Sequence, residues 1–334
     1  MTSGYDVDDH ERFDRPKRSS RPRTKQRPAH DDAVTGRVIT LNRGRYTLLV
    51  DDDADGERTV TAMKARALGR GSIVVGDDVR IVGDISGADG SLARIVDVEP
   101  RRSVLRRTAD DDDPIERVIV ANADQMVIVV ALADPEPRPR LIDRCLVAAY
   151  DADMDPLLCL TKADLKSRSE ELEQYEPLGV PTVTTQQGGD LDPLRDALRD
   201  RTSVLVGHSG VGKSTLVNAL IPGADRVTSE VNVVTGRGRH TSTSAYALRL
   251  PFGGWLVDTP GIRSFGLAHV DLGHVLSGFG DLAAATANCP RGCTHTADEP
   301  ECGLDSAVAA GEIDPRRVDS FRRLLASREP RAGD

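Results

Sequence analysis

The stretch TSVLVGHSGVGKSTLVNAL at residues 202–220 decides the fold of the central part of this chain. An apolar run, TSVLVG, leads into a glycine-rich segment that starts at Gly207, and the run TLVNAL that follows is typical of a helix. A strand, a Gly-x4-Gly-Lys-Ser loop and a helix in this order form a P-loop, in which backbone N–H groups surround phosphate oxygens at a helix N-terminus. A glycine-rich turn that merely begins a helix is the alternative, and the pair of Lys213 and Ser214 argues against it.

The P-loop supplies most of the expected nucleotide contacts. Lys213 is expected to reach the terminal phosphates, and the Ser214 hydroxyl is expected to ligate Mg²⁺. His208 is interpreted as a tolerated variable position within the loop. The predicted contacts in this stretch are Gly207, His208, Ser209, Gly210, Val211, Gly212, Lys213, Ser214 and Thr215.

Two segments downstream of the P-loop predict switches. Asp258-Thr-Pro-Gly261 ends an apolar strand, where Asp258 can hold Mg²⁺ through water and the Gly261 N–H can sense the γ-phosphate. A plain turn after a strand is the alternative for these four residues. Before them, GRGRHTSTS at residues 236–244 predicts a mobile switch, and both Thr241 and Ser242 are candidate magnesium ligands in the GTP-bound state.

The base of the nucleotide is predicted from the segment Thr161-Lys162-Ala163-Asp164. This segment follows the apolar run PLLCL and is similar to the guanine-specificity motif Asn-Lys-x-Asp. An Asp carboxylate accepts both the N1 and the exocyclic amino protons of guanine, a donor pair that adenine lacks. We therefore expect Thr161, Lys162, Ala163 and Asp164 to bind guanine and Asp164 to select GTP. Thr161 in place of Asn removes one amide and is expected to loosen the base loop without altering the choice of guanine.

The order of these motifs predicts a circularly permuted domain. The guanine motif precedes the P-loop here, whereas ordinary GTPases carry it after the switch motifs. Permutation is allowed when the old chain ends lie close together and the sheet is unchanged. Apolar strands alternate with helix-like runs around the motifs, which is typical of a doubly wound parallel sheet with helices on both faces. We predict this α/β domain over residues 108–266, and its alternating pattern begins after an acidic linker at residues 109–113.

Residues 33–107 predict a five-stranded OB-type β-barrel. Six short β-like runs, TGRVITL, RYTLLVD, RTVTAMK, SIVVG, DDVRIVG and LARIVDVE, recur there between Asp, Gly and Asn clusters. Tyr46 is the only aromatic residue in this segment, so any RNA contact should use arginines on backbone phosphates. The candidates are Arg43, Arg45, Arg101, Arg102, Arg106 and Arg107. A barrel that only packs on its neighbour is the alternative.

Residues 1–32 predict a basic disordered arm. Eight basic residues and a single acid lie between Arg12 and Arg27, with almost no apolar residues to form a core. Such an arm either keeps the chain soluble or grips RNA phosphates. The whole chain carries 44 Lys and Arg against 53 Asp and Glu, a net charge of −9, which argues against a uniformly basic nucleic-acid binder.

Length and hydropathy exclude other classes of protein. A chain of 334 residues has room for two or three domains. Its longest apolar run, residues 126–133, is far shorter than the roughly 20 residues of a membrane span. No apolar stretch follows the charged N-terminus, so we expect no secretory signal. A cytoplasmic protein without membrane contact is therefore expected.

A cysteine and histidine cluster predicts one structural Zn²⁺. Three of the five cysteines, Cys289, Cys293 and Cys302, lie beside His295 in the sequence, and together they provide the four ligands of a tetrahedral site. No acid in the cluster is placed as a base, which favours structural over catalytic zinc. Unligated cytosolic cysteines are the alternative. A small helical zinc-binding domain is predicted over residues 267–334.

Taken together, these motifs resemble the RsgA (YjeQ) family of circularly permuted GTPases. The resemblance rests on the barrel, VANADQMVIVVALADP, LIDRCLVAAY, TKADL, GHSGVGKSTLVNAL, GRGRHTSTS, DTPGIRSFGL and the cysteine and histidine cluster, which cover nearly the whole chain after the arm. It implies a multidomain α/β protein with an OB barrel, a permuted P-loop domain and a small zinc-bearing helical domain. The family leaves four residues in the first gap between zinc ligands and five in the last, where this chain has three and six, so the loop geometry is expected to differ.

The resemblance also implies a function in maturation of the small ribosomal subunit. We expect the chain to bind the 30S subunit and its 16S rRNA as a monomer, without DNA, and to hydrolyse GTP to GDP when the subunit stimulates it. Lys213, Asp258 and His240 are the predicted catalytic residues. His240 matches the family's switch histidine and would orient water, and a solvated switch histidine is the alternative. Ile262 stands where many GTPases place a water-orienting Gln, so intrinsic hydrolysis should be slow.

Two other functions stay open at this point. In the first, the chain is an RNA-binding or zinc-dependent adaptor in which the nucleotide is only a structural ligand, and the absent Gln favours this slightly. In the second, it is a P-loop kinase that phosphorylates a small acceptor with ATP, against which Asp164 and Asp258 both argue. Measured turnover of GTP, with and without small ribosomal subunits, distinguishes these functions.

Overall fold

A computed structural model describes most of the chain after the predicted arm. Contacts divide the chain into Met1–Asp32 and Ala33–Asp334, and the second unit holds every element described below. The described residues are 30–42, 44–52, 56–69, 73–108, 116–224, 245–259, 265, 267 and 270–327. Predictions that fall outside them concern residues 1–29 of the arm, Arg43, the acidic linker, His240, Thr241, Ser242, Gly261 and Ile262.

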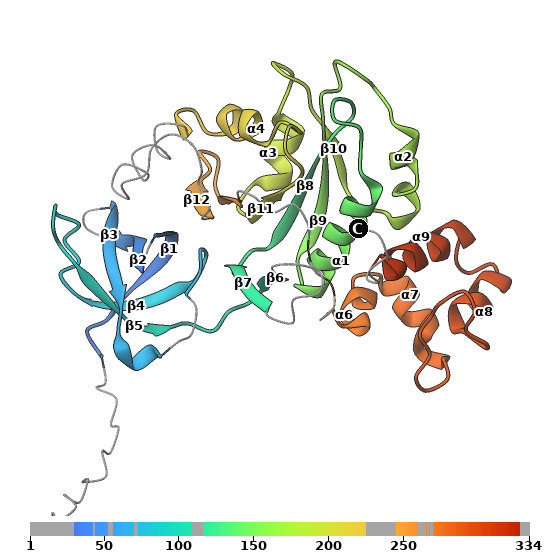
Figure 1. The fold of residues 1–334 in the computed structure, drawn as a ribbon, viewed down its shortest axis with the longest axis horizontal. Helices are drawn as coiled ribbons and strands as arrows, with labels where there is room; N and C mark the ends of the chain where they lie inside the picture. Colours follow the sequence, from blue (N-terminus) through green and yellow to red (C-terminus); the bar gives the residue numbers. More distant parts are fainter. Residues whose placement is uncertain are drawn as a thin grey trace, which may run out of the picture. The chain divides into compact units, whose positions relative to one another are not determined.

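Five strands close into a barrel, which confirms the predicted OB-type fold (Figure 1). They are β1 (Val34–Asn42), β2 (Arg45–Asp52), β3 (Gly56–Lys64), β4 (Asp78–Gly83) and β5 (Ala93–Val98). The order is β1-β2-β3-β5-β4, and β4 pairs back with β1 to close the ring. β3 and β5 are parallel, and the other neighbours are antiparallel. Successive side chains of a strand face opposite sides, so alternate apolar residues fill one shared interior.

The run SIVVG was expected to add a barrel strand and does not. Ile73, Val74 and Val75 are buried, but Val75 makes only an isolated bridge to Val120. The Val74 N–H donates to the buried carboxylate of Asp77 at 2.8 Å, which bends the chain at this point. Apolar composition alone does not separate a buried turn from a short buried strand.

A doubly wound sheet follows the barrel, as predicted. Its strands are β8 (Gln125–Ala131), β9 (Asp155–Thr161), β10 (Thr182–Thr184), β11 (Thr202–Val206), β12 (Tyr246–Arg249) and β13 (Trp255–Asp258). The order is β10-β9-β8-β11-β13-β12, in which β12 is antiparallel to β13 and the other neighbours are parallel. Every residue of β8 is buried, because this strand lies inside the sheet and both faces are covered. β6 (Val104–Thr108) and β7 (Glu116–Ala121) form a separate antiparallel pair.

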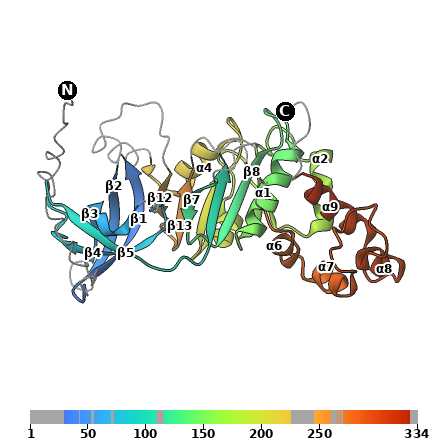
Figure 2. The same cartoon turned by 60° about the horizontal axis from the view of Figure 1, so that its bottom comes forward.

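Helices cover both faces of this sheet (Figure 2). They are α1 (Pro139–Asp151), α2 (Glu170–Glu173), α3 (Asp192–Leu198) and α4 (Lys213–Leu220). α1 packs in one core with Met126 and Ile128 of β8, whereas α3 and α4 pack in another with Val127 and Val129. Neighbouring residues of β8 thus face opposite cores, which explains why the sequence of this strand is continuously apolar.

One strand pair joins the barrel to the sheet. β1 pairs antiparallel with β12, with Thr40 opposite Tyr246, so the strands of both regions form a single eleven-stranded sheet. The Glu57 carboxylate of β3 also forms an ion pair with the Arg249 guanidinium of β12. The barrel is therefore attached along the strand next to the one that ends in Asp258.

The C-terminal region is helical, as predicted. Its helices are α6 (Leu272–Ser277), α7 (Gly280–Ala285), α8 (Gly303–Ala309) and α9 (Pro315–Ala326). Asp314 is the N-cap of α9, and its carboxylate accepts the Arg316 N–H at 2.9 Å. Phe321 of α9 is buried and packs edge-on against Phe279, with ring centroids 5.4 Å apart. This contact joins α9 to the start of α7 in one apolar core.

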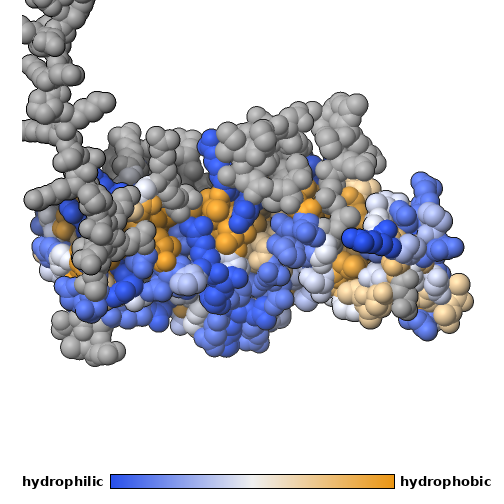
Figure 3. Space-filling model, turned by 90° about the horizontal axis from the view of Figure 1, so that it is seen from below, coloured by the Kyte–Doolittle hydropathy of each residue, from blue (hydrophilic) through white to orange (hydrophobic). Residues whose placement is uncertain are grey.

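Hydrophilic residues predominate on the face of the molecule in Figure 3, where apolar residues form separate patches. The large apolar side chains exposed among the described residues are Met63, Leu92 and Leu165. Within the described ranges, no helix combines the length and the apolar composition that crossing a membrane requires.

Candidate functional site

The P-loop begins where β11 ends and closes around the amine of Lys213. Gly207 and Gly212 have φ angles of 153° and 92°, and a Cβ on Gly207 would lie 2.5 Å from the Val129 carbonyl oxygen, so glycine is required there. The Lys213 amine donates to the carbonyls of Gly207 and His208, the latter at 3.0 Å. The loop thus holds a cation at the N-terminus of α4, where phosphate oxygens would meet both this charge and backbone N–H groups.

The Lys213 amine is half-buried, and its pKa is lowered as a result. Burial disfavours the charged ammonium and is the larger influence, while the negative charge of Asp258 opposes it. An anionic phosphate beside the amine would add a second charge that keeps the ammonium protonated. The local electrostatics therefore suit a polyphosphate ligand.

A cavity of about 490 Å³ brings the guanine motif and the P-loop helix together. Its lining includes Lys162 and Asp164 of the guanine motif together with Gly212 and Thr215 around the start of α4. A volume of this size is usual for small-ligand sites. The two motifs follow different parallel strands, and only the sheet places their loops at one edge. This cavity is the candidate site for the base.

Thr161 attaches the guanine motif to the P-loop. The residue is buried, and its hydroxyl donates to the Val211 carbonyl at 2.7 Å. The Lys162 amine donates to the Asp134 carbonyl and holds the next residue of the motif as well. The hydroxyl of Thr161 thus makes its own contact with the P-loop, and the loosening expected from the absent Asn stays a prediction.

The loop after β10 also belongs to this cavity, and sequence reasoning missed it. Its lining residues are Thr185, Gln186, Gln187, Gly188 and Gly189. The Ala163 N–H donates to the Thr185 carbonyl at 3.2 Å, which ties this loop to the guanine motif. The run VPTVTT had predicted the strand, and loops at the carboxyl ends of neighbouring parallel strands meet at one edge. That rule could have placed the loop beside the base.

Asp258 ends β13 with one carboxylate oxygen bound and the other without a partner. Its Oδ2 accepts a hydrogen bond from the Tyr246 hydroxyl at 2.8 Å. Its Oδ1 is buried and has no hydrogen-bond partner among the residues that the structure describes. Such an oxygen is costly unless a cation or a water molecule meets it, and Mg²⁺ prefers oxygen ligands. Asp258, with the exposed Ser214 hydroxyl at the start of α4, fits the predicted magnesium site.

The other predicted switch residues lie outside the described residues. They are His240, Thr241, Ser242 and Gly261. Their assignments as water-orienting, magnesium-binding and phosphate-sensing groups stay predictions. The described part of the site consists of the P-loop, the guanine motif, Asp258 and the loop after β10 that lines the cavity.

The four predicted zinc ligands form one cluster. One ligand atom from each of Cys289, Cys293, His295 and Cys302 lies within 4.8 Å of all the others. The His295 Nδ1 lies 3.7, 3.3 and 3.7 Å from the three sulfurs in chain order. The Gly303 N–H donates to the Cys289 sulfur at 3.1 Å, a contact that favours a thiolate. The cluster could therefore hold a tetrahedral Zn²⁺.

Two of the arginines expected to meet RNA phosphates form ion pairs with acids. Arg101 forms a two-point ion pair with Asp77, at 2.7 and 2.8 Å, and the Asp77 side chain is completely buried. Arg102 pairs with Asp124 at 2.9 Å. Turning Arg101 outward would leave a buried carboxylate without its cation, so this residue has a structural role. Arg45 is exposed on β2.

Comparisons with known sequences agree with this arrangement. Residues 98–268 match the family described as RsgA GTPase. A Pseudomonas aeruginosa (strain LESB58) protein named Small ribosomal subunit biogenesis GTPase RsgA is 41% identical over 303 residues, which cover 88% of this chain and 85% of that protein. A Gemmatimonas aurantiaca protein of the same name is 36% identical over 304 residues, which cover 87% of this chain and 96% of that protein.

Solved structures agree with the fold. The crystal structure of YjeQ from Thermotoga maritima matches with a TM-score of 0.64 and 28% identity, over 90% of this chain and 100% of that chain. YloQ, described as a circularly permuted GTPase, matches with a TM-score of 0.63 over 91% of this chain and 99% of that chain. At 24% identity, this second match shows the fold alone.

Proposed function

The chain belongs to the RsgA GTPase family, and from this we propose that it binds the small (30S) ribosomal subunit, assists or checks the late maturation of that subunit, and hydrolyses GTP to GDP and phosphate when the subunit stimulates it. The family and the GTP-hydrolysing activity expected from the motifs are confirmed. One observation supports the choice of nucleotide, namely the cavity that joins Asp164 to the P-loop helix. The names of the relatives support the ribosomal partner.

The base and the phosphates are held by residues from different strands in this proposal. Asp164 accepts the N1 and amino protons of guanine, and the stem of Lys162 packs on the base. Thr161 keeps this loop attached to the P-loop through the Val211 carbonyl. Lys213 and the P-loop N–H groups stabilise the charge of the phosphates.

In this proposal, Mg²⁺ and the attacking water are bound by residues of the P-loop helix, the predicted switches and the end of β13. Asp258, Ser214 and one of the hydroxyls of Thr241 and Ser242 would hold Mg²⁺. A bound Mg²⁺ supplies charge neutralisation at the terminal phosphates. His240 orients the water that attacks the γ-phosphate.

The remaining parts of the chain provide structure and contacts with the subunit. Zinc held by the cluster that includes Cys302 and His295 is structural, because four protein ligands leave no position for a substrate. Exposed arginines such as Arg45 and the basic arm contact phosphates of 16S rRNA. The chain acts in the cytoplasm as a monomer and uses neither DNA nor a membrane.

Turnover of GTP by the purified protein, with and without small ribosomal subunits, tests this proposal. We expect strong stimulation by the subunit that is absent with ATP and lost in Asp164→Asn. Negligible turnover that the subunit does not change, despite tight binding of guanine nucleotide, would favour an adaptor instead. Phosphorylation of a small acceptor by ATP would favour a kinase.

A further inference from the structure

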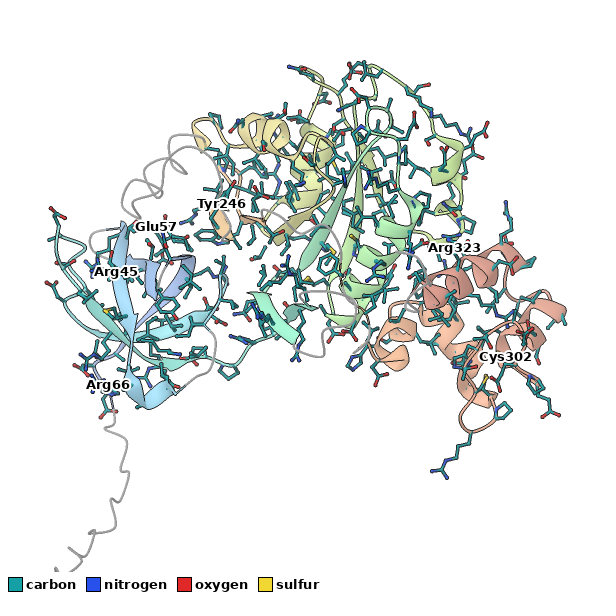
Figure 4. The ribbon with its side chains drawn as sticks, in the orientation of Figure 1. Arg45, Glu57, Arg66, Tyr246, Cys302 and Arg323 are labelled. Carbon is teal, nitrogen blue, oxygen red and sulfur yellow. The ribbon has the colours of Figure 1, made fainter. Side chains whose placement is uncertain are left out.

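Tyr246 and Asp258 face each other across two strands. They are directly opposite in the antiparallel pair of β12 and β13, so their side chains lie on the same face of the sheet. The next pair on that face, Leu248 and Leu256, packs in one core with α4, the helix of the P-loop. The Tyr246 hydroxyl, labelled on its strand in Figure 4, donates to Oδ2 of Asp258 at 2.8 Å.

β12 holds Tyr246 in place from both edges. One neighbouring strand is β13, and the other is β1 of the barrel, with Thr40 opposite Tyr246. The ion pair between Glu57 and Arg249 attaches the far end of the same strand. A residue in a strand that is paired on both sides has little backbone freedom. Tyr246 is therefore a firm support for the carboxylate that it contacts.

The hydrogen bond gives the two oxygens of Asp258 different environments. Oδ2 is bound by Tyr246, whereas Oδ1 is buried and has no hydrogen-bond partner within the described ranges. The χ2 angle of an aspartate has a broad energy minimum, so a carboxylate without an anchor rotates easily. Lys213 is a cation to which the freed carboxylate could turn, and its amine is now bound to carbonyls of the P-loop.

We propose that Tyr246 is a positioning residue for the magnesium site, because its hydroxyl fixes one oxygen of Asp258 and thereby keeps the other oxygen available to Mg²⁺ or to water bound to the ion. This inference rests on the proposed function, since it takes the P-loop site to bind GDP or GTP with Mg²⁺. Tyr246 acts only through Asp258 and contacts neither the nucleotide nor the metal.

Binding of a fluorescent GDP analogue to the full chain tests this role without relying on turnover. Tyr246→Phe removes the hydroxyl and leaves the ring. Affinity is measured over a series of Mg²⁺ concentrations and in excess EDTA. In EDTA we expect the variant to match the wild type. The Mg²⁺ concentration that gives half of the gain in affinity should rise about tenfold, because a hydrogen bond to a charged group is lost.

Two variants serve as controls. Asp258→Asn should remove most of the gain in affinity that Mg²⁺ gives. Tyr150→Phe removes another tyrosine hydroxyl, on α1, where the ring packs against Phe279 with centroids 4.6 Å apart. This matched variant should give the wild-type Mg²⁺ curve. Thermal melting of all variants checks that each one is folded.

Three results would overturn the positioning role. If Tyr246→Phe follows the wild-type Mg²⁺ curve while Asp258→Asn is shifted, Tyr246 does not position Asp258, and the proposed function is untouched. If Tyr246→Phe loses the same affinity in EDTA as in Mg²⁺, the hydroxyl has only a general structural role. If the wild-type chain does not bind guanine nucleotide at all, both this inference and the proposed function are wrong.

Discussion

The two predicted metal sites of this chain are built in opposite ways. The zinc ligands all come from residues 289–302, and the N–H of the adjacent Gly303 supports one of them. The magnesium site instead combines Ser214 at the start of α4 with Asp258 at the end of β13. Turns between near neighbours in the chain form the first site, whereas the second exists only when distant strands pair in register. The comparison teaches that either site can be damaged while the other survives.

The largest effect is expected from removing a zinc ligand. Cys302→Ser should abolish stoichiometric zinc and lower the free energy of unfolding by about 3 kcal/mol or more, because structural zinc contributes directly to folding. Cys302 is buried, so the lost ligand also leaves a polar hydroxyl in the core. Metal analysis and melting with and without a chelator measure this. Affinity for GDP should change by less than about threefold, because distant sites act independently.

Cys159→Ala is the matched control for that variant. Cys159 is also a buried free cysteine, but it lies on β9, outside the cluster. The Cys159→Ala variant should contain as much zinc as the wild type does. Loss of zinc in both variants would mean that zinc content reports general unfolding, and the contrast between the two sites would then be broken.

A change in the base site should weaken nucleotide binding and leave the zinc content unchanged. Asp164→Asn is expected to weaken GTP binding by about 100-fold or more, because the amide cannot accept both guanine protons. Binding of a xanthine nucleotide should improve, since xanthine has a carbonyl where guanine has its amino group. Nucleotide titrations measure both effects, and zinc content should be unchanged.

Asp153→Asn controls for loss of one negative charge on the same domain. Asp153 is exposed just after α1 and does not line the base cavity. It should bind GTP as the wild type does. Equal weakening in both variants would show that the overall charge matters and that Asp164 does not read the base.

A smaller effect is expected where the guanine motif meets the P-loop. Thr161→Val keeps the shape of the side chain and removes the hydroxyl that donates to Val211. Affinity for GDP should fall roughly fivefold, which corresponds to about 1 kcal/mol for a buried hydrogen bond. Thr161→Ser keeps the hydroxyl and should bind as the wild type does. If Ser weakens binding while Val binds as the wild type does, packing of the methyl group matters and the hydrogen bond does not.

The smallest effect is expected where α9 meets the nucleotide-binding domain. Arg323 of α9 lies over the Tyr175 ring, 5.1 Å from its centroid, and its guanidinium bonds the buried Asp143 at 3.4 Å. Arg323→Met should lower the free energy of unfolding by about 1 kcal/mol. Arg316→Met on the same helix removes an exposed ion pair with Asp314 and should have almost no effect.

The decrease in the free energy of unfolding that Arg323→Met causes should depend on pH. Burial raises the pKa of Asp143, and the charge of Arg323 opposes this, so the variant should have a still higher pKa at Asp143 in the folded state. The folded variant then binds more protons than the unfolded chain, and its stability falls as pH rises above the ordinary carboxylate pKa. The melting temperatures of the variant and the wild type should therefore differ more at about pH 8 than at about pH 5. A constant difference would contradict this.

Sequence patterns predicted the elements that depend on local residues. The P-loop, the guanine motif and the zinc ligands were each recognisable because their chemistry requires a fixed spacing within a short stretch. SIVVG was misread because its apolar residues fit a strand as well as a buried turn, and the hydrogen bond to Asp77 that bends it is not visible in a pattern. Gln186 and Gln187 were missed because a short polar loop has no motif of its own.

By itself, the sequence determined the permuted order of the motifs, the prediction of a guanine nucleotide and the set of candidate zinc ligands, because residue type and spacing along the chain are enough for these. Only the tertiary structure decided that Thr161 bonds to Val211, that Arg101 is held by Asp77, and that Tyr246 supports Asp258. These contacts depend on which strands are neighbours and on their register. A shift of one residue would turn every side chain of a strand to the other face, and no local pattern specifies that alignment.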